Sequence, residues 1–124
     1  MTRALQVVSL LAALLLANAA ADATDSAEAA AEIDRLASAV GASGCTFIRN
    51  GKRYDAGDAE AHLRMKYRRG KRYAPTAELF IERLASRSSM SKKPYYIECD
   101  GSEPVDTASW LTERLEEFRA RAAN

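Results

Sequence analysis

Apolar residues recur every three or four positions in four separate stretches of the chain, which is the spacing of amphipathic helices. This spacing places the apolar side chains on one face of each helix, where they can pack against a core. The predicted helices cover residues 25–41, 58–70, 76–85 and 106–118. Their apolar stripes are Ile33, Leu36, Ala37 and Val40, then Ala59, Leu63 and Tyr67, then Ala77, Phe80, Ile81, Leu84 and Ala85, and finally Trp110, Leu111, Leu115 and Phe118.

Polar capping residues and a glycine mark the ends of these helices. An Asp or Thr before a helix can accept a hydrogen bond from a backbone N–H of the first turn. We expect Asp58 to cap the second helix and Thr76 to cap the third. The fourth helix has Asp106 or Thr107 at its start, and Gly70 is expected to end the second helix.

A β-hairpin is predicted in residues 44–56, which read GCTFIRNGKRYDA. Asn50 and Gly51 stand between two short strand-like runs, and both tolerate the positive φ that a tight two-residue turn requires. Such a turn pairs Arg49 with Lys52, Ile48 with Arg53, and Phe47 with Tyr54. The pairing places Cys45, Phe47 and Tyr54 on the same side of the sheet.

The segment YYIEC, residues 95–99, predicts a third strand, because Tyr95, Ile97 and Cys99 alternate with more polar positions. If this strand lies antiparallel beside the first, Cys99 meets Cys45 and every inward side chain is apolar or aromatic. The sequence therefore predicts an α+β fold. We expect a small three-stranded antiparallel sheet of order 2-1-3, packed against about four amphipathic helices.

The first 21 residues have the pattern of a secretory signal peptide. Arg3 precedes an apolar run from Val7 to Leu16, and small residues with an A-x-A-like cleavage pattern follow, so that cleavage is expected after Ala19 or Ala21. The run is shorter than the roughly 20 apolar residues that span a bilayer. We therefore expect a periplasmic protein without a transmembrane segment after cleavage, folded as a single α+β domain over residues 22–124.

Cys45 and Cys99 are the two cysteines of the chain. In an exported protein their default state is a disulfide. A bridge that closes a loop of about 55 residues stabilises a small domain by roughly 4 kcal/mol. A redox-active pair usually has the spacing C-x-x-C, which these two cysteines lack.

Charge is unevenly distributed along the chain. Residues 45–93 carry an excess of Lys and Arg, whereas the segments on either side carry an excess of Asp and Glu. The densest basic patch consists of Arg68, Arg69, Lys71 and Arg72. It is either solvated surface, offset by the acidic helices, or a basic face for an anionic partner. Nucleic acid is not expected as that partner, because an exported protein meets little of it.

Several segments together resemble a family of small exported proteobacterial proteins, a domain of unknown function. They are SGCTFIRNG followed by Tyr54, then AHLRMKY, then TAELFIERLASRSSMSKKPYYIEC, then Trp110 and Leu111. The resemblance covers about residues 40 to 115 and implies a periplasmic location and a shared fold, but no activity. At Lys92 it leads us to expect glycine, and a lysine there argues against a tight turn with positive φ.

The candidate site combines one helix with a serine-rich loop. His62, the only histidine, and Lys66 lie on the apolar stripe of the second helix, where they either line its edge or serve a function. Hydroxyl groups of the loop SRSSMSKKP could donate hydrogen bonds to a sugar or a phosphate. The predicted ligand-binding set is Arg49, His62, Lys66, Ser88, Ser89 and Ser91.

The leading functional hypothesis is a binding or accessory domain for an anionic envelope ligand or an envelope protein, active as a monomer or weak oligomer. The alternative is a small hydrolase in which His62 activates a loop serine, which requires the two side chains to touch. We expect no cofactor. We also expect no metal site, because no second histidine or free cysteine could complete one.

Overall fold

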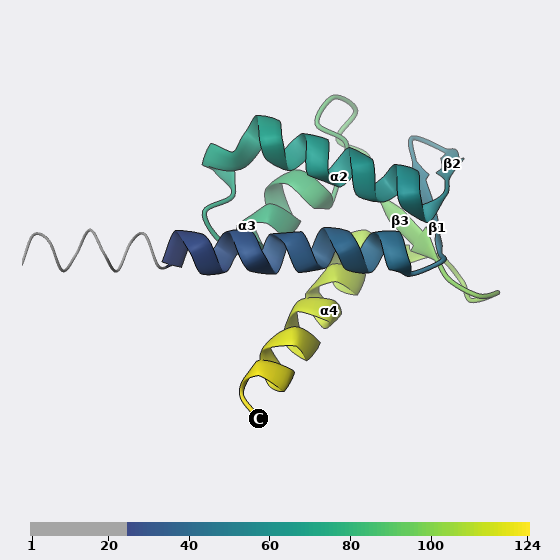
Figure 1. Ribbon diagram of the computed structural model, residues 1–124. Coiled ribbons are helices and arrows are strands. Elements are labelled where there is room, and N and C mark those ends of the chain that lie inside the picture. Colours follow the sequence, from purple (N-terminus) through teal and green to yellow (C-terminus); the bar gives the residue numbers. More distant parts are fainter. Residues whose placement is uncertain (1–24) are drawn as a thin grey trace, which may run out of the picture.

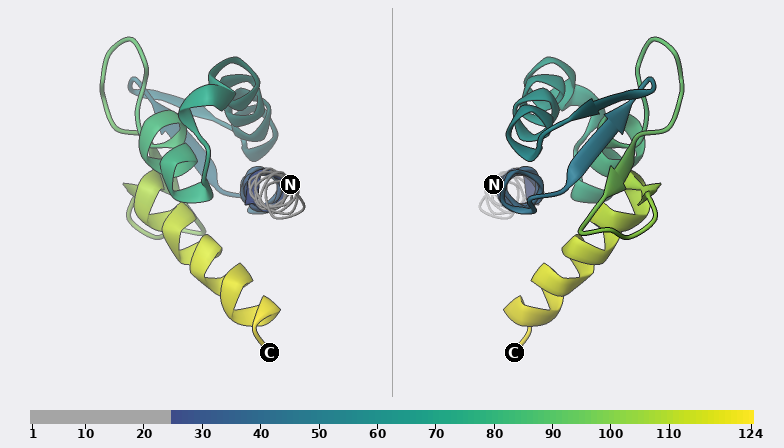
Figure 2. Two further views of the ribbon diagram at one scale, coloured as in Figure 1. Left: turned by 90° about the vertical axis from the view of Figure 1, so that its left-hand side faces the viewer. Right: turned by 90° about the vertical axis from the view of Figure 1, so that its right-hand side faces the viewer.

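The structure is a computed structural model that describes residues 25–124 (Figure 1). The expected signal peptide, residues 1–21, lies outside the described residues. Residues 25–124 form four helical regions and a small antiparallel sheet, which confirms the predicted α+β class. The N-terminal helix and α2 lie side by side, and α4 projects away from them (Figure 2).

The helices follow the predicted apolar stripes. The N-terminal helix covers residues 25–42, α2 is Ala56–Gly70, the short α3 is Ala77–Phe80, and α4 is Thr107–Ala122. A 3₁₀ turn, η1 (Lys71–Tyr73), follows α2, and a π-helical turn, η2 (Ile81–Ala85), continues α3. The predicted third helix therefore exists, but its second half is wound more widely than an α-helix.

Two of the predicted helix caps are confirmed and one is wrong. The Thr76 side chain accepts a hydrogen bond from the N–H of Leu79, and Asp106 caps α4. The second helix begins earlier than predicted, at Ala56, so its cap is Asp55 and not Asp58. Asp55 Oδ1 accepts a hydrogen bond from the Asp58 N–H at 2.8 Å.

This difference in capping gives a measurable expectation. Changing Asp55 to Ala should lower the free energy of unfolding by about 1 kcal/mol, because the first turn of α2 then loses its side-chain acceptor. The matched variant Asp58→Ala removes only a charge from the first turn and should cost a few tenths of that. Urea denaturation measures the free energy of unfolding of both variants. A larger loss of stability in Asp58→Ala than in Asp55→Ala would contradict the assignment of Asp55 as the cap.

The sheet has the order β2-β1-β3-β4. Strands β1 (Thr46–Arg49) and β2 (Lys52–Tyr54) form the hairpin, and β3 (Tyr96–Glu98) pairs antiparallel with β1. The register confirms the prediction, with Phe47 opposite Tyr54, Ile48 opposite Arg53 and Arg49 opposite Lys52. A fourth strand, β4 (Val105–Asp106), extends the predicted 2-1-3 order at the β3 edge. Two residues are too few to show a periodic pattern, which is why the sequence did not reveal it.

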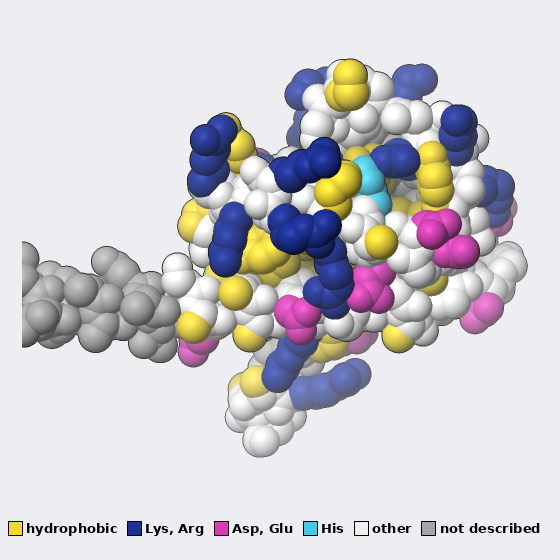
Figure 3. All heavy atoms as spheres, turned by 45° about the horizontal axis from the view of Figure 1, so that its top comes forward, with side chains coloured by type: hydrophobic (Ala, Val, Ile, Leu, Met, Phe, Trp, Pro, Cys, Tyr) yellow, Lys and Arg dark blue, Asp and Glu magenta, His cyan; other side chains and the backbone are white. Residues whose placement is uncertain are grey.

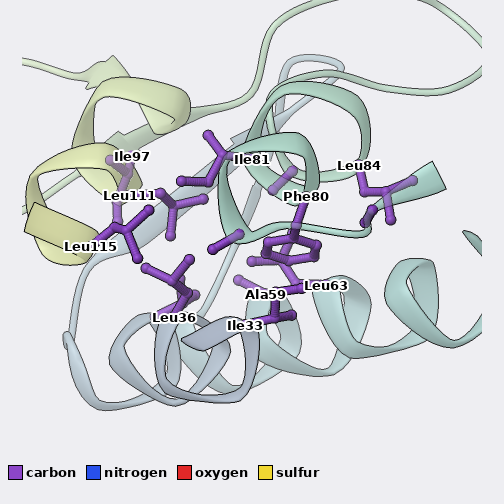
Figure 4. Packing of buried hydrophobic residues seen from close by; sticks show 14 of the residues in the cluster. Ile33, Leu36, Ala59, Leu63, Phe80, Ile81, Leu84, Ile97, Leu111 and Leu115 are labelled. Atoms are coloured by element: carbon purple, nitrogen blue, oxygen red, sulfur yellow. The ribbon is translucent and has the colours of Figure 1, made fainter. Parts of the chain in front are cut away.

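A disulfide joins Cys45 and Cys99, as predicted, with the two Cα atoms 4.4 Å apart. Cys45 precedes β1 and Cys99 follows β3, so the bridge closes one end of the central strand pair. The core lies between the sheet and the helices, and Phe80 is fully buried near its centre (Figure 4). Ile33, Leu36, Leu63, Ile97 and Leu111 are also fully buried, and all of them belong to one cluster.

The serine-rich segment between η2 and β3 is a loop with internal hydrogen bonds. The N–H of Lys92 donates to the carbonyl of Ser88 at 3.0 Å, and the N–H of Ser88 donates to the carbonyl of Lys93 at 3.0 Å. Lys92 adopts φ 63°, so the expectation that a lysine at this position argues against a positive-φ turn is wrong. The closed loop supplies the hydrogen bonds that offset the cost of this conformation for a residue other than glycine.

Candidate functional site

A cavity of about 940 Å³ opens beside α2, the hairpin and the serine-rich loop. In Figure 3 the cyan side chain of the single histidine lies in this hollow, with dark blue basic side chains around it. The cavity is lined by Arg49, Asn50, Lys52 and Tyr54 from the hairpin, His62, Met65, Lys66, Arg69 and Gly70 from α2, Tyr73 from η1, Arg83 and Leu84 from η2, Ser88, Ser89 and Met90 from the loop, and Tyr95.

Five of the six predicted ligand-binding residues therefore share one cavity. Arg49, His62, Lys66, Ser88 and Ser89 all line it. Ser91 does not line it, and its Oγ instead donates to Asn50 Oδ1 at 2.5 Å, which ties the loop to the turn of the hairpin. Of the predicted basic patch, Arg69 lines the cavity, whereas Arg68, Lys71 and Arg72 do not.

The structure brings these residues together through a close approach of α2 and η2. Gly70, at the end of α2, is buried against Leu84. A Cβ atom at position 70 would lie 2.8 Å from Leu84 Cδ2, closer than real contacts allow. The absence of a side chain at Gly70 thus leaves room for the Leu84 side chain of η2 against α2. The serine-rich loop follows η2 beside the face of α2 that carries His62 and Lys66.

Lys66 is the most unusual side chain of the cavity. It is only 8% exposed, and its Nζ donates to the carbonyl of Arg87 at 2.9 Å and to the Tyr95 hydroxyl at 3.1 Å. Within residues 25–124 no carboxylate forms an ion pair with it. Burial, with smaller contributions from the charges of Arg49 and Lys92, lowers the pKa of Lys66 to about 8.

His62 stands between Arg49 and Tyr95. The Arg49 Nη1 atom lies 3.0 Å from each ring nitrogen, and His62 Nε2 lies 3.2 Å from the Tyr95 hydroxyl. A guanidinium can only donate, so this contact requires an uncharged imidazole that accepts. Burial first, and then the charges of Arg49 and Lys66, lower the pKa of His62 to about 4. His62 is therefore neutral at physiological pH.

Tyr95 connects the two sides of the site. Its hydroxyl accepts from Lys66 and contacts His62, and burial raises its pKa above the ordinary value. Arg49 is held in turn by Tyr54, whose hydroxyl accepts from Nη2 at 3.1 Å and whose ring lies 4.7 Å below the guanidinium carbon. These contacts fix Arg49, His62, Lys66 and Tyr95 relative to one another before any ligand is present.

The lining carries strong positive charge and no acidic side chain. Its Lys and Arg residues are Arg49, Lys52, Lys66, Arg69 and Arg83. In the described part of the chain none of the five forms a salt bridge, whereas several surface arginines outside the cavity do. An adjoining cavity of about 260 Å³ shares Arg49, Tyr54, His62 and Tyr95, and there one acidic residue, Asp58, is part of the lining. The lining of the larger cavity thus offers several hydrogen-bond donors to an anion and contains no carboxylate.

The contact that the hydrolase alternative requires is not formed in the structure. His62 makes its hydrogen bonds to Arg49 and Tyr95, and none joins it to a serine of the described loop. The Ser88 side chain is buried and accepts from the N–H of Ser91 at 3.3 Å. A base acts on a nucleophile only within hydrogen-bond reach. Among the described residues, the hydrogen-bond partners of His62 are thus Arg49 and Tyr95.

Sequence reasoning missed Tyr54 and Tyr95 as site residues and assigned both to the inward face of the sheet. The alternation of polarity predicts which side chains point inward, but it cannot show whether they meet the core or a cavity. One available signal was that an inward tyrosine hydroxyl needs a polar partner. His62 and Lys66, the polar residues on the core-facing stripe of the second helix, were the available partners for these tyrosine hydroxyls.

Over residues 25–124 the structure contains no group of three or more His, Cys, Asp or Glu side chains that could hold a metal ion. None of the helices described there is both long and apolar enough to cross a bilayer.

Comparison with known proteins identifies a family. Residues 27–119 match the profile of DUF5329, a family of unknown function. A segment of 50 residues is 44% identical to the uncharacterized protein YfeK of Salmonella typhimurium and covers 40% of this chain and 42% of that relative. The aligned part is thus less than half of YfeK. No solved structure matches the chain. The family match spans most of the chain, and we conclude that the chain belongs to the DUF5329 family.

Proposed function

We propose that this protein is a binding module of the bacterial periplasm that captures a small anionic ligand in the cavity of Arg49, His62, Lys66 and Tyr95. The anionic group would contact Lys66 and Arg49, with Ser88 and Ser89 near it as further hydrogen-bonding groups. The aromatic and aliphatic lining would contact an apolar portion of the ligand. The disulfide supports an exported location, because such bonds persist in oxidising compartments. The intact mass of protein recovered from a periplasmic extract checks the expected cleavage after Ala19 or Ala21.

The observation that carries this proposal is the buried ammonium group of Lys66, for which the described residues offer no carboxylate. A buried cation without a counter-ion is costly, and proteins usually pair it. The cost is tolerable if a ligand supplies the missing negative charge during function. Arg49 adds a second donor at the same site, and its contacts to Tyr54 and His62 hold it there.

A direct test uses phenyl phosphate as the anionic probe and phenol as its neutral control. We expect phenyl phosphate to shift the backbone amide signals of Lys66, Ser88 and Ser89 in two-dimensional NMR spectra, and phenol to leave them unchanged. The ion pair between Arg119 of α4 and Glu32 of the N-terminal helix lies outside the cavity lining and provides signals that should not move. Equal shifts from both compounds, or shifts that avoid the cavity, would contradict anion recognition at this site.

The affinity for phenyl phosphate should fall as the pH rises through about 8. The charged and titratable groups facing Lys66 are Arg49, Lys92, His62 and Tyr95. Burial lowers the pKa of His62 to about 4 and raises that of Tyr95, whereas the pKa of Lys66 is about 8. Its loss of a proton removes a charge-assisted hydrogen bond, which corresponds to about a tenfold weaker affinity. The variant Lys66→Arg keeps its charge at high pH, so its affinity should not depend on pH in this range. Isothermal titration calorimetry at pH 7 and at pH 9.5 measures both; an unchanged affinity in the wild type would refute the role of Lys66.

A further inference from the structure

We propose that the mouth of the cavity docks on an anionic phospholipid bilayer through the loop that carries Met90, and that the captured ligand is the phosphate-bearing headgroup of a lipid in that bilayer. This inference rests on the proposed function and assigns a source to its anionic ligand. It is carried by an exposed apolar side chain at the mouth, by the basic residues around it, and by the hydrogen bonds that hold the loop in place.

Met90 projects fully into solvent next to the cavity. It is 96% exposed and it also belongs to the cavity lining. Tyr73, another exposed apolar side chain of the lining, is 48% exposed. Two of the four large hydrophobic side chains that are exposed in residues 25–124 thus stand at this mouth. Hydrophobic groups gathered beside a polar cavity are typical of an interaction surface rather than of ordinary solvated surface.

The loop holds Met90 in this position instead of folding it over the cavity. Backbone hydrogen bonds join Ser88 with Lys92 and with Lys93, and the Ser91 hydroxyl donates to Asn50 in the turn of the hairpin. The loop is therefore anchored to η2, β3 and the hairpin turn. Because the loop around Met90 is already ordered, little conformational entropy is lost when Met90 inserts into the bilayer.

The charges around Met90 fit a negatively charged surface. From Arg83 to Ile97 the chain has four basic residues and no acidic residue. Arg87, Lys92 and Lys93 are exposed within the loop, and Lys52 and Arg69 are exposed at the rim of the cavity. Each Lys or Arg near an anionic leaflet strengthens the electrostatic attraction of the protein to that leaflet. The long basic side chains can reach the lipid phosphates while an apolar neighbour inserts among the acyl chains.

A bilayer fits these features better than an acidic protein. Met90 and Tyr73 are two separate exposed side chains and do not form an extended apolar face for a folded partner. Met90 can, however, insert between headgroups without a shaped pocket, since acyl chains adapt to it. The same orientation brings the cavity opening, with Lys66 and Arg49 below it, to the level of the lipid phosphates.

The test measures co-sedimentation of the protein, recovered from the periplasm of an expression host, with two kinds of vesicle. One kind contains phosphatidylcholine alone and the other contains phosphatidylcholine with phosphatidylglycerol. We expect binding to the anionic vesicles only, with a strong decrease at high salt. The variant Met90→Ser should bind them about fivefold more weakly, which corresponds to burying roughly half of a methionine side chain. The matched control Val105→Ser, an exposed apolar residue of β4, should bind as the wild type does.

Phenyl phosphate binding separates this inference from the proposed function. Lys93→Gln should bind phenyl phosphate as the wild type does, because Lys93 is exposed in the loop outside the cavity lining. The same variant should bind the anionic vesicles more weakly, because it removes a charge that faces the bilayer. If phenyl phosphate binds in the cavity but the vesicles do not bind, or bind without dependence on Met90, the bilayer inference is wrong and the anion site stands. If neither binds, the proposed function has failed. If the protein binds soluble polyglutamate as strongly as anionic vesicles, and Met90→Ser weakens neither interaction, the surface around the cavity mouth binds an acidic protein instead of a bilayer.

Discussion

Replacing Cys45 and Cys99 together with alanine should lower the free energy of unfolding by about 4 kcal/mol. The bridge spans a sequence separation of 54 residues and joins the strands at the centre of the sheet, so its loss greatly enlarges the conformational freedom of the unfolded chain. Small domains have a total stability of about 5–15 kcal/mol, and the variant therefore loses a large share of it.

Urea denaturation followed by circular dichroism measures this loss. The reduced wild-type protein is the matched control, because it lacks the bridge but keeps both cysteines, and it should unfold at nearly the same urea concentration as the double variant. A loss below about 1 kcal/mol would mean that the bridge constrains the unfolded chain far less than its loop length predicts.

Changing Lys66 to Met should weaken anion binding and at the same time make the protein more stable. Methionine has a similar length and carries no charge, so the cost of burying an ammonium group disappears. The lost hydrogen bonds to Arg87 and Tyr95 offset part of this gain, and Tyr95 keeps its contact with His62. We expect the free energy of unfolding at pH 7 to rise by about 1 kcal/mol.

The same variant should bind phenyl phosphate at least about tenfold more weakly, the usual effect of losing a charge-assisted hydrogen bond. The control Lys93→Met changes an exposed lysine outside the cavity lining and should alter neither stability nor phenyl phosphate affinity appreciably. A structural role for Lys66 predicts the opposite for stability. A Lys66→Met protein that is clearly less stable than the wild type would therefore contradict the account.

The fold was largely predictable because local signals agreed with one another. Asn50 and Gly51 determine the register of the hairpin, and the inward positions of Cys45 and Cys99 determine which strand is central. The cap of α2 was misassigned because Gly57 resembles a helix boundary, whereas the helix runs through it from Ala56. No residue pattern distinguishes the π-helical η2 from an α-helix, since both bury the same apolar stripe.

The site was predictable only in part, because a cavity is a property of packing. Polar residues on an apolar stripe pointed to His62 and Lys66, and the hydroxyl-rich loop pointed to Ser88 and Ser89. Tyr95 and Tyr54 escaped notice because inward aromatic residues usually belong to a core. The turn at Lys92 could not be foreseen from residue preference, since hydrogen bonds of the closed loop, one of them from the Lys92 N–H to the Ser88 carbonyl, accompany its positive φ.

The central claim is that Lys66 stays charged in the cavity in order to meet an anion, and the pKa of its ammonium group tests this most directly. Carbon NMR of protein labelled at the lysine side chains follows the titration of Lys66, and the Lys66→Met variant assigns its signal. Burial lowers the pKa of Lys66 to about 8 in the protein alone. Saturating phenyl phosphate should raise this pKa by about one unit, because a bound anion stabilises the charged form. A pKa that is near the ordinary lysine value in the protein alone, or that does not change with phenyl phosphate, would contradict the account.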